Sequence, residues 1–217
     1  MLTIRVGTET NKQEFVAHES FLTSRSEFFR RAMNGRWAEA ESRVVMLPAD
    51  EPQYFALYLN FVYTGQLNTM GKSKEELATL ELSEAMKHIK QEYQDLFRLY
   101  ILAEKLQDVA AKNAALTAAI SVTELKSAGG NWDIPTLEVV NSVYKCTLEG
   151  SPARRLLTDM YSTLPPIKLL RLSRRTFPHE EFISDLAIAL RTTCPLKEGV
   201  PGNVALKNGA QAYLEEV

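Results

Sequence analysis

The hydrophobic residues between positions 50 and 65 form two stripes rather than one. At helical spacing, the first stripe consists of Phe55, Tyr58, Leu59 and Val62. The second stripe lies on the opposite side of the helix and consists of Tyr54, Leu57 and Phe61. Asp50 can cap a first helical turn, Pro52 suits the position just inside it, and Gly65 can end a helix in the left-handed conformation. The pattern therefore predicts a helix that has no clean polar face.

A helix with two apolar stripes must be covered on two sides. Leaving a large apolar side chain in water costs roughly 1.5–3 kcal/mol. The cover can come from the chain's own helices or from a partner, and the sequence leaves both readings open. We therefore take the second stripe, Tyr54, Leu57 and Phe61, as a candidate interaction surface or buried joint.

The N-terminal pattern predicts two strands and then short helices. Leu2, Ile4 and Val6 alternate with polar residues, and a polar turn leads to a second strand at 14–18. Ser26 can cap a second short helix that Asn34-Gly35 ends. The brief β-branched run at 43–48 then predicts a buried strand.

From Asn68 to Gln91 the chain turns polar, and we expect a solvated, partly helical insertion at 68–91. Apolar density returns at 96–106 and continues through an alanine-rich stretch at 109–120, which predicts two consecutive helices with a bend near Gln107-Asp108. The glycines of 127–131 favour a domain boundary there.

The rest of the chain predicts helices and then a tail. Apolar residues recur at helical spacing across 131–192, which we expect to be an all-helical C-terminal region. Residues 193–217 have little periodicity and several glycines and prolines, so a loose tail is expected. The predicted organisation is a first domain over 1–126, the helical region over 131–192, and the tail.

Composition narrows the class of protein. The 217 residues are 45% hydrophobic, and the formal net charge is −2, which gives no general attraction to nucleic acid or anionic membranes. No run approaches the roughly 18–20 apolar residues of a membrane span, and no signal peptide is apparent. Two cysteines, Cys146 and Cys194, do not indicate a disulfide framework. We expect an intracellular protein without nucleic-acid or membrane partners.

Candidate chemistry is sparse. The stretch 65–73 nearly matches a phosphate-binding loop, but five residues separate its glycines where four are needed, and it follows a predicted helix rather than a strand. His18 lies at a strand-to-helix corner, where hydrogen bonding to the backbone is the simpler role. His88 and His179 lack partners at ligand spacing, so no metal is predicted.

Nucleophiles and basic clusters add little to this picture. No Gly-x-Ser-x-Gly stretch is present, and the position of Cys146 on a predicted helix favours a buried, inert thiol. A basic cluster precedes Phe177 and is followed by acidic residues, which favours a solvated face with ion pairs: Lys168, Arg171, Arg174 and Arg175. We predict no catalytic residue and no cofactor.

Several linked segments carry a family resemblance. They are Phe15 to Leu22, Arg25 to Phe29, Met33 to Glu39, Val44 to Leu47, and Phe61 to Gly65. In order and spacing they resemble the "F-x-V-H-x-x-x-L", "R-S-x-F-F", "G-x-x-x-E" and "F-x-Y-T-G" segments of BTB/POZ domains. The resemblance covers about residues 2 to 121, and the region from 131 is similar to the helical extension of uncharacterised fungal members.

The resemblance implies an α+β fold, with a small three-stranded sheet and clustered helices, followed by the helical region. It assigns fold-determining roles to the residues that match its motifs: His18, Arg25, Ser26, Phe28, Phe29, Tyr63 and Gly65. It also implies a protein-interaction module rather than an enzyme, located in the cytoplasm, the nucleus or both. An adaptor for a cullin ubiquitin ligase or for a transcriptional or chromatin complex is the leading hypothesis.

At two points the sequence departs from the family pattern, and both departures bear on which partners we expect for this chain. Many cullin-binding members carry a hydrophobic-x-glutamate motif, which we align with Phe55, Ala56 and Leu57, so Leu57 replaces the glutamate and weakens the expectation of cullin binding. The chain also begins at the strand of Leu2 to Val6, without the extra helix of swapped dimers. Self-association is expected in another form, if at all. An architectural self-assembly protein without a client is the alternative, and an unrecognised enzyme is third.

Overall fold

The chain consists of a small sheet, many helices and a helical C-terminal region, which confirms the predicted α+β fold. The computed structural model describes residues 1–67, 69, 72, 74–125, 134–165, 169, 176–193 and 208–216. Within them, no helix is both long enough and apolar enough to cross a bilayer.

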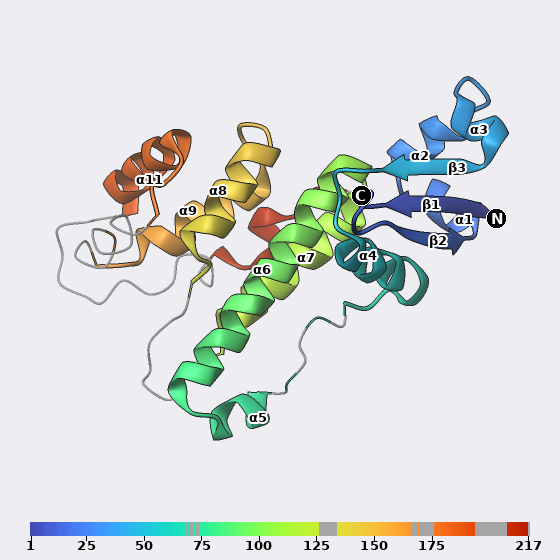
Figure 1. Ribbon diagram of the computed structural model, residues 1–217. Helices are drawn as coiled ribbons and strands as arrows, with labels where there is room; N and C mark the ends of the chain where they lie inside the picture. Colours follow the sequence, from blue (N-terminus) through green and yellow to red (C-terminus); the bar gives the residue numbers. More distant parts are fainter. Residues whose placement is uncertain are drawn as a thin grey trace. The chain divides into compact units, whose positions relative to one another are not determined.

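The described strands form one sheet in the order β2-β1-β3 (Figure 1). β1 (Leu2–Val6) pairs antiparallel with β2 (Gln13–Ala17) and parallel with β3 (Val44–Leu47). The alternating residues of β1 that the sequence identified are fully buried. Gly7, with a φ of +99°, makes the turn after β1; a Cβ there would lie 2.2 Å from the Asn11 carbonyl oxygen.

Short helices connect β2 to β3. They are α1 (Glu19–Thr23), α2 (Glu27–Ala32) and α3 (Ala38–Ser42). The predicted cap of α2 is confirmed, because the Ser26 hydroxyl accepts a hydrogen bond from the Phe29 amide at 3.2 Å. The third of these helices was not predicted from the sequence.

Helix α4 (Pro52–Thr64) is the predicted two-stripe helix, and it ends at Gly65 with a φ of +70°. The predicted cap was wrong. Glu51 occupies the capping position and makes no side-chain cap bond, while the Asp50 carboxylate instead accepts from Lys105 Nζ at 2.5 Å. A long cationic side chain from a distant helix reaches this carboxylate, which local sequence does not reveal.

The polar segment after α4 is more helical than the sequence suggested. Its described part holds α5 (Lys74–Thr79) and the start of α6 (Leu82–Leu106). Ala85 and Ile89 are buried at a spacing of four residues, and Tyr93 continues the stripe. The end of the predicted insertion is therefore the first part of a long amphipathic helix, with only one narrow apolar stripe among its charges.

The predicted bend after α6 is confirmed. Gln107 has a φ of +54°, and α7 (Val109–Val122) starts two residues later. Asp108 caps α7, because its Oδ1 accepts from the Ala111 amide at 2.9 Å. The corner between the two helices is thus fixed by a strained backbone residue and a capping carboxylate.

The chain divides into two compact units. The first, here called the sheet unit, comprises Met1–Thr69, Arg98–Ala115 and Glu216–Val217; the second, the helical unit, comprises Met70–Phe97 and Leu116–Glu215. The boundary predicted at 127–131 lies outside the described residues.

The helical unit contains α8 (Leu137–Cys146), α9 (Pro152–Ser162) and α11 (Glu180–Thr193), and α9 packs against both other helices (Figure 1). Its core is aromatic and aliphatic: Val140, Val143, Tyr144, Leu156, Leu157, Met160, Tyr161 and Phe182. The nearly buried Arg154 donates from Nε to the Thr147 hydroxyl at 3.0 Å and also pairs with Glu181. This arginine therefore joins all three helices.

Two expectations for this region need correction. The Cys146 side chain is exposed rather than buried, because it lies at the end of α8, beyond the last turn that faces the core. The end of the predicted loose tail is not loose over 208–216. There the 3-10 helix η1 (Ala210–Tyr213) contacts α9, and Tyr213 is buried.

Candidate interaction surface

The second stripe of α4 lies largely in the interior of the sheet unit. Tyr54 and Phe61 are each only 6% exposed, and Leu57 is half-buried. The guanidinium of Arg25 lies 4.6 Å from the centre of the Phe61 ring, a cation–π contact. The chain's own residues thus cover both aromatic side chains of this stripe.

A buried carboxylate links α4 to the α6–α7 corner. Asp108 is fully buried, and its Oδ2 accepts from Arg25 Nε at 3.2 Å and from the Tyr58 hydroxyl at 3.1 Å. Burial and the neighbouring carboxylate raise the pKa of Tyr58 well above its usual range, so its hydroxyl remains a donor. Asp108 is therefore fully used as an acceptor within the fold.

The neighbouring motif residue makes a second link to the same corner. The Ser26 hydroxyl donates to the Leu106 carbonyl oxygen at 2.5 Å while it caps α2. Phe29, on the first turn of α2, is fully buried. Arg25, Ser26 and Phe29 therefore each contact the interior of the sheet unit.

Two other motif residues meet at the surface. The Tyr63 hydroxyl accepts from the His18 amide at 2.9 Å and lies 3.0 Å from His18 Nδ1. Phe21 stands beside them, with its ring centre 4.9 Å from that of Tyr63. Phe21 is 43% and Tyr63 is 42% exposed. We call His18, Phe21 and Tyr63 the aromatic cluster.

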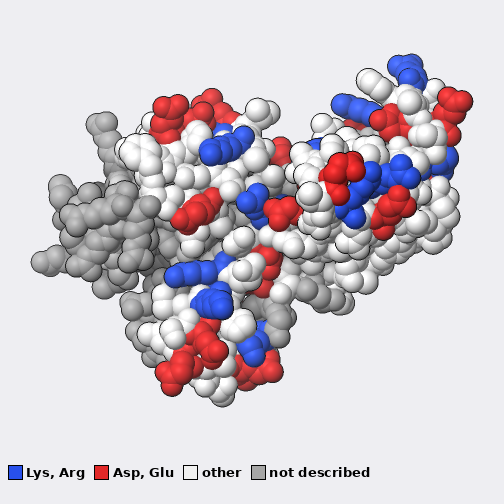
Figure 2. Space-filling model, viewed as in Figure 1, with Lys and Arg blue, Asp and Glu red and all other residues white. Residues whose placement is uncertain are grey.

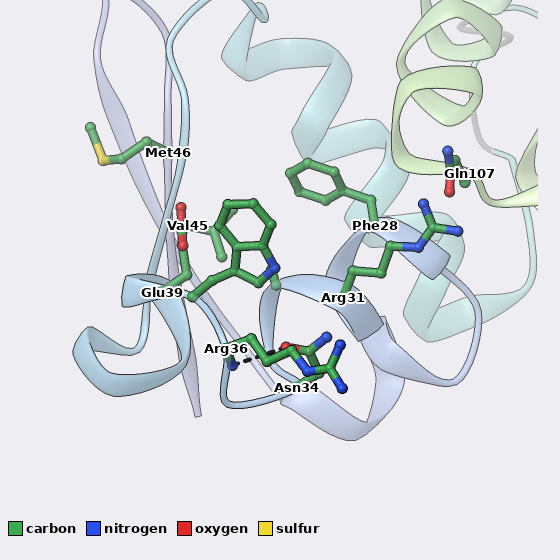
Figure 3. A pocket seen from close by; sticks show the side chains of 10 residues that line it. Phe28, Arg31, Asn34, Arg36, Glu39, Val45, Met46 and Gln107 are labelled. Atoms are coloured by element: carbon green, nitrogen blue, oxygen red, sulfur yellow. Dashed lines mark hydrogen bonds between the residues drawn. The ribbon is translucent and has the colours of Figure 1, made fainter.

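A hollow of about 680 Å³ opens between α2, α3 and β3, and we call it the Trp37 groove. Trp37 lines it and is 62% exposed, and Met46 is 46% exposed. In Figure 3, Phe28 of α2 and Val45 of β3 lie on opposite sides of the hollow. A concave surface with exposed apolar side chains is typical of a site that receives another molecule.

Local sequence explains how the groove forms. α2 stops at Ala32, and the Asn34 side chain accepts from the Arg36 amide at 3.0 Å, the dashed contact in Figure 3. Gly35, with a φ of +82°, takes a turn that other residues avoid. Trp37 then precedes α3 in an extended conformation, so its ring lies outside any regular element.

Charged residues edge the groove. Arg31, Arg36 and Glu39 line it, and Arg31 Nε donates to Glu27 at 3.0 Å. Over the face shown in Figure 2, positive and negative side chains are interspersed rather than separated into fields. The groove therefore combines an apolar centre with mixed polar edges, as the cores and rims of protein interfaces do.

The remaining described candidates from the sequence, His88 and His179 among them, neither line the Trp37 groove nor belong to the aromatic cluster. In the described part of the chain, no group of three or more His, Cys, Asp or Glu residues could hold a metal. His88 is exposed on α6, and His179 is half-buried just before α11. The basic cluster before Phe177, Cys194 and part of the loop-like stretch at 65–73 lie outside the described residues.

Residues 2–98 match the family model of the BTB/POZ domain. Residues 2–98 form a BTB/POZ domain. BTB/POZ domains are interaction modules rather than enzymes, and they mediate contacts between proteins, including self-association. No curated protein is similar enough in sequence to count as a match. The match ends within α6, so the described helices from α7 onward lie beyond the matched residues.

Sequence reasoning missed the exposed members of both surfaces. Trp37 and Phe21 stand within segments that carry the family resemblance, and Met46 stands in a strand expected to be buried. One signal was available for Trp37. A large aromatic residue directly after Asn-Gly-Arg, outside any apolar periodicity, has no predicted core to enter.

Proposed function

We propose that this BTB/POZ protein is an adaptor that binds a segment of another polypeptide in the Trp37 groove. The observation that carries the proposal is the exposure of Trp37 beside an apolar hollow in a domain whose general role is protein interaction. Exposed aromatic residues in pockets are the usual anchors of such interfaces.

The groove suggests what the partner segment offers. An apolar side chain would fill the space near Phe28 and Val45, and polar or acidic neighbours would meet Arg31 and Arg36. A cullin scaffold or a component of a transcriptional or chromatin complex is the proposed class of partner. Leu57, half-buried on α4, is not among the residues that line the groove.

The test is a binding assay with purified full chain and a cullin N-terminal region, alongside affinity capture from native cells. Trp37→Ala should weaken capture at least tenfold, which corresponds to about 1.4 kcal/mol. Phe21→Ala is the matched control, because it removes an exposed aromatic ring from a different surface. Unchanged binding by Trp37→Ala would contradict the role of the groove, whichever partner is captured.

The aromatic cluster supports a second candidate function, self-assembly. Phe21 and Tyr63 expose neighbouring rings on the sheet unit, and neither residue lines the Trp37 groove. Light scattering as a function of concentration tests it. Association that Phe21→Ala abolishes would support an architectural role, whereas a strict monomer at tens of micromolar would rule it out.

A further inference from the structure

The end of the chain carries a short docked segment, residues 208–216. Within it, the Tyr213 ring is buried against the helical unit, and its hydroxyl donates to Asp159 Oδ2 of α9 at 2.6 Å. Asn208 Nδ2 lies 3.0 Å from the same hydroxyl oxygen and 3.4 Å from Asp159 Oδ2. Tyr213 and Asn208 therefore both tie the segment to Asp159 of α9.

The rest of the segment contributes little buried surface. Tyr213 is the one fully buried residue among 208–216; four others are half-buried, namely Gly209, Ala210, Leu214 and Glu215, and the rest are exposed. η1 contacts α9. A nine-residue segment with a single buried anchor gains little against the chain freedom that it loses on docking. We therefore expect its attachment to be weaker than that of the core helices.

The site on α9 selects tyrosine by its chemistry. The ring is withdrawn from water, while the carboxylate of Asp159 accepts a charge-assisted hydrogen bond from the phenolic hydroxyl. Burial, followed by the bond to Asp159, raises the pKa of Tyr213, so the hydroxyl stays protonated and able to donate. Phenylalanine in the same place would leave that carboxylate without this donor.

The docked segment also supplies its own backbone geometry. Gly209, with a φ of +72°, turns the chain into η1, and the Ala212 amide donates to the Gly209 carbonyl oxygen. The backbone hydrogen bonds of this turn lie within the segment itself. We therefore expect a separate peptide of the same sequence to be able to adopt the turn when it binds α9.

We propose that α9 carries a binding site for a tyrosine-bearing peptide segment, and that residues 208–216 occupy this site in cis as a releasable strap. The strap covers the site until it detaches, and a free segment of the same kind then competes for it. The proposed site lies on α9 of the helical unit, and the inference is independent of the Trp37 groove.

The first test uses the full chain and a fluorescent synthetic peptide of residues 208–216. Tyr213→Ala should bind the peptide at least tenfold more tightly than the unaltered chain, whose site is filled. A peptide with phenylalanine in place of its tyrosine should bind Tyr213→Ala at least tenfold more weakly. Gln211→Ala, which alters an exposed residue of the strap, should behave like the unaltered chain.

Two results of this assay would overturn the proposal. The first is absence of peptide binding by Tyr213→Ala when its circular dichroism shows intact helices. The second is equal peptide binding by the unaltered chain and Tyr213→Ala.

The second test needs no variant and covers the case in which Tyr213→Ala fails to fold. Amide hydrogen exchange is measured on the unaltered full chain at Ala212 and Leu214, whose amides donate within the strap. If the strap is releasable, the amides of Ala212 and Leu214 should exchange more slowly than in the free peptide and faster than the amides of α9. Exchange at the free-peptide rate, at the rate of α9, or with protection that rises with protein concentration would each contradict a releasable strap in cis.

Discussion

Helix α4 and the turn before α3 both carry large aromatic side chains, and the fold treats them in opposite ways. Tyr54 and Phe61 of α4 are almost completely covered, whereas Trp37 in the turn is 62% exposed. A helix with apolar residues on two sides belongs to the interior, because both stripes require cover. An aromatic residue in a polar turn receives no such cover from its own element. The better candidate for an interaction surface is therefore the isolated aromatic residue, not the double stripe.

The largest effect on stability is expected from truncating the buried aromatic residues of α4. Phe61→Ala should lower the free energy of unfolding by about 3–5 kcal/mol, because it leaves a cavity and removes the ring beneath Arg25. The loss of unfolding free energy caused by Tyr54→Ala should lie in the same range. Urea unfolding followed by circular dichroism measures both. Full stability with a loss of partner binding would place these residues on an interface after all.

Removing the carboxylate below α4 should have the next largest effect. Asp108→Ala takes away the acceptor of Arg25 and Tyr58 and the cap of α7. Breaking a buried pair costs about 3–5 kcal/mol, and Arg25 is partly exposed, so we expect a loss of about 3 kcal/mol in unfolding free energy. Asp50→Ala, which removes a more exposed ion pair with Lys105, is the control and should cost less than about 1 kcal/mol.

Local signals explain what the sequence could predict. The alternation in β1, the cap at Ser26 and the left-handed Gly65 each depend on neighbours within a few residues. The corner at Gln107-Asp108 is of the same kind. These features were predicted because short-range sterics and hydrogen bonding decide them.

Features that depend on distant residues were not predictable. The Trp37 groove requires α2 and β3 to meet, and Phe28 and Met46 are 18 positions apart in the sequence (46 − 28). Asp50 forms an ion pair with Lys105 on α6 instead of capping α4 as expected. The hydroxyl of the buried Tyr213 donates to Asp159, which is far away in the sequence. Periodicity within one element contains none of this information.

Because Trp37 is exposed, its substitution should affect partner affinity much more than the free energy of unfolding. Trp37→Ala should change the unfolding free energy by no more than about 0.5 kcal/mol, because the ring contributes little to the interior. Its effect on partner affinity should be about 1.4 kcal/mol or more, as proposed above. Thermal unfolding and a binding assay on the same preparation separate the two. A large drop in melting temperature would show that the ring supports the fold instead.

The smallest predicted effect concerns an ion pair that joins α1 to the residue before β3. Glu19 pairs with Arg43, and that hydrogen bond lowers the pKa of Glu19 below its usual 4.5. Both side chains are about one-third exposed or more, so Glu19→Gln should cost only about 0.5 kcal/mol at pH 7.

Because the pKa of Glu19 is lowered in the folded state, the contribution of this ion pair depends on pH in one direction. It should be fully present above pH 4.5 and should disappear as the pH falls through the lowered pKa. Urea unfolding of the unaltered chain and Glu19→Gln at several pH values tests this. Glu41→Gln, an exposed residue of α3, is the control and should leave stability at pH 7 unchanged. A difference between the unaltered chain and Glu19→Gln that grows below pH 4.5 would mean that Arg43 does not stabilise the charged form of Glu19.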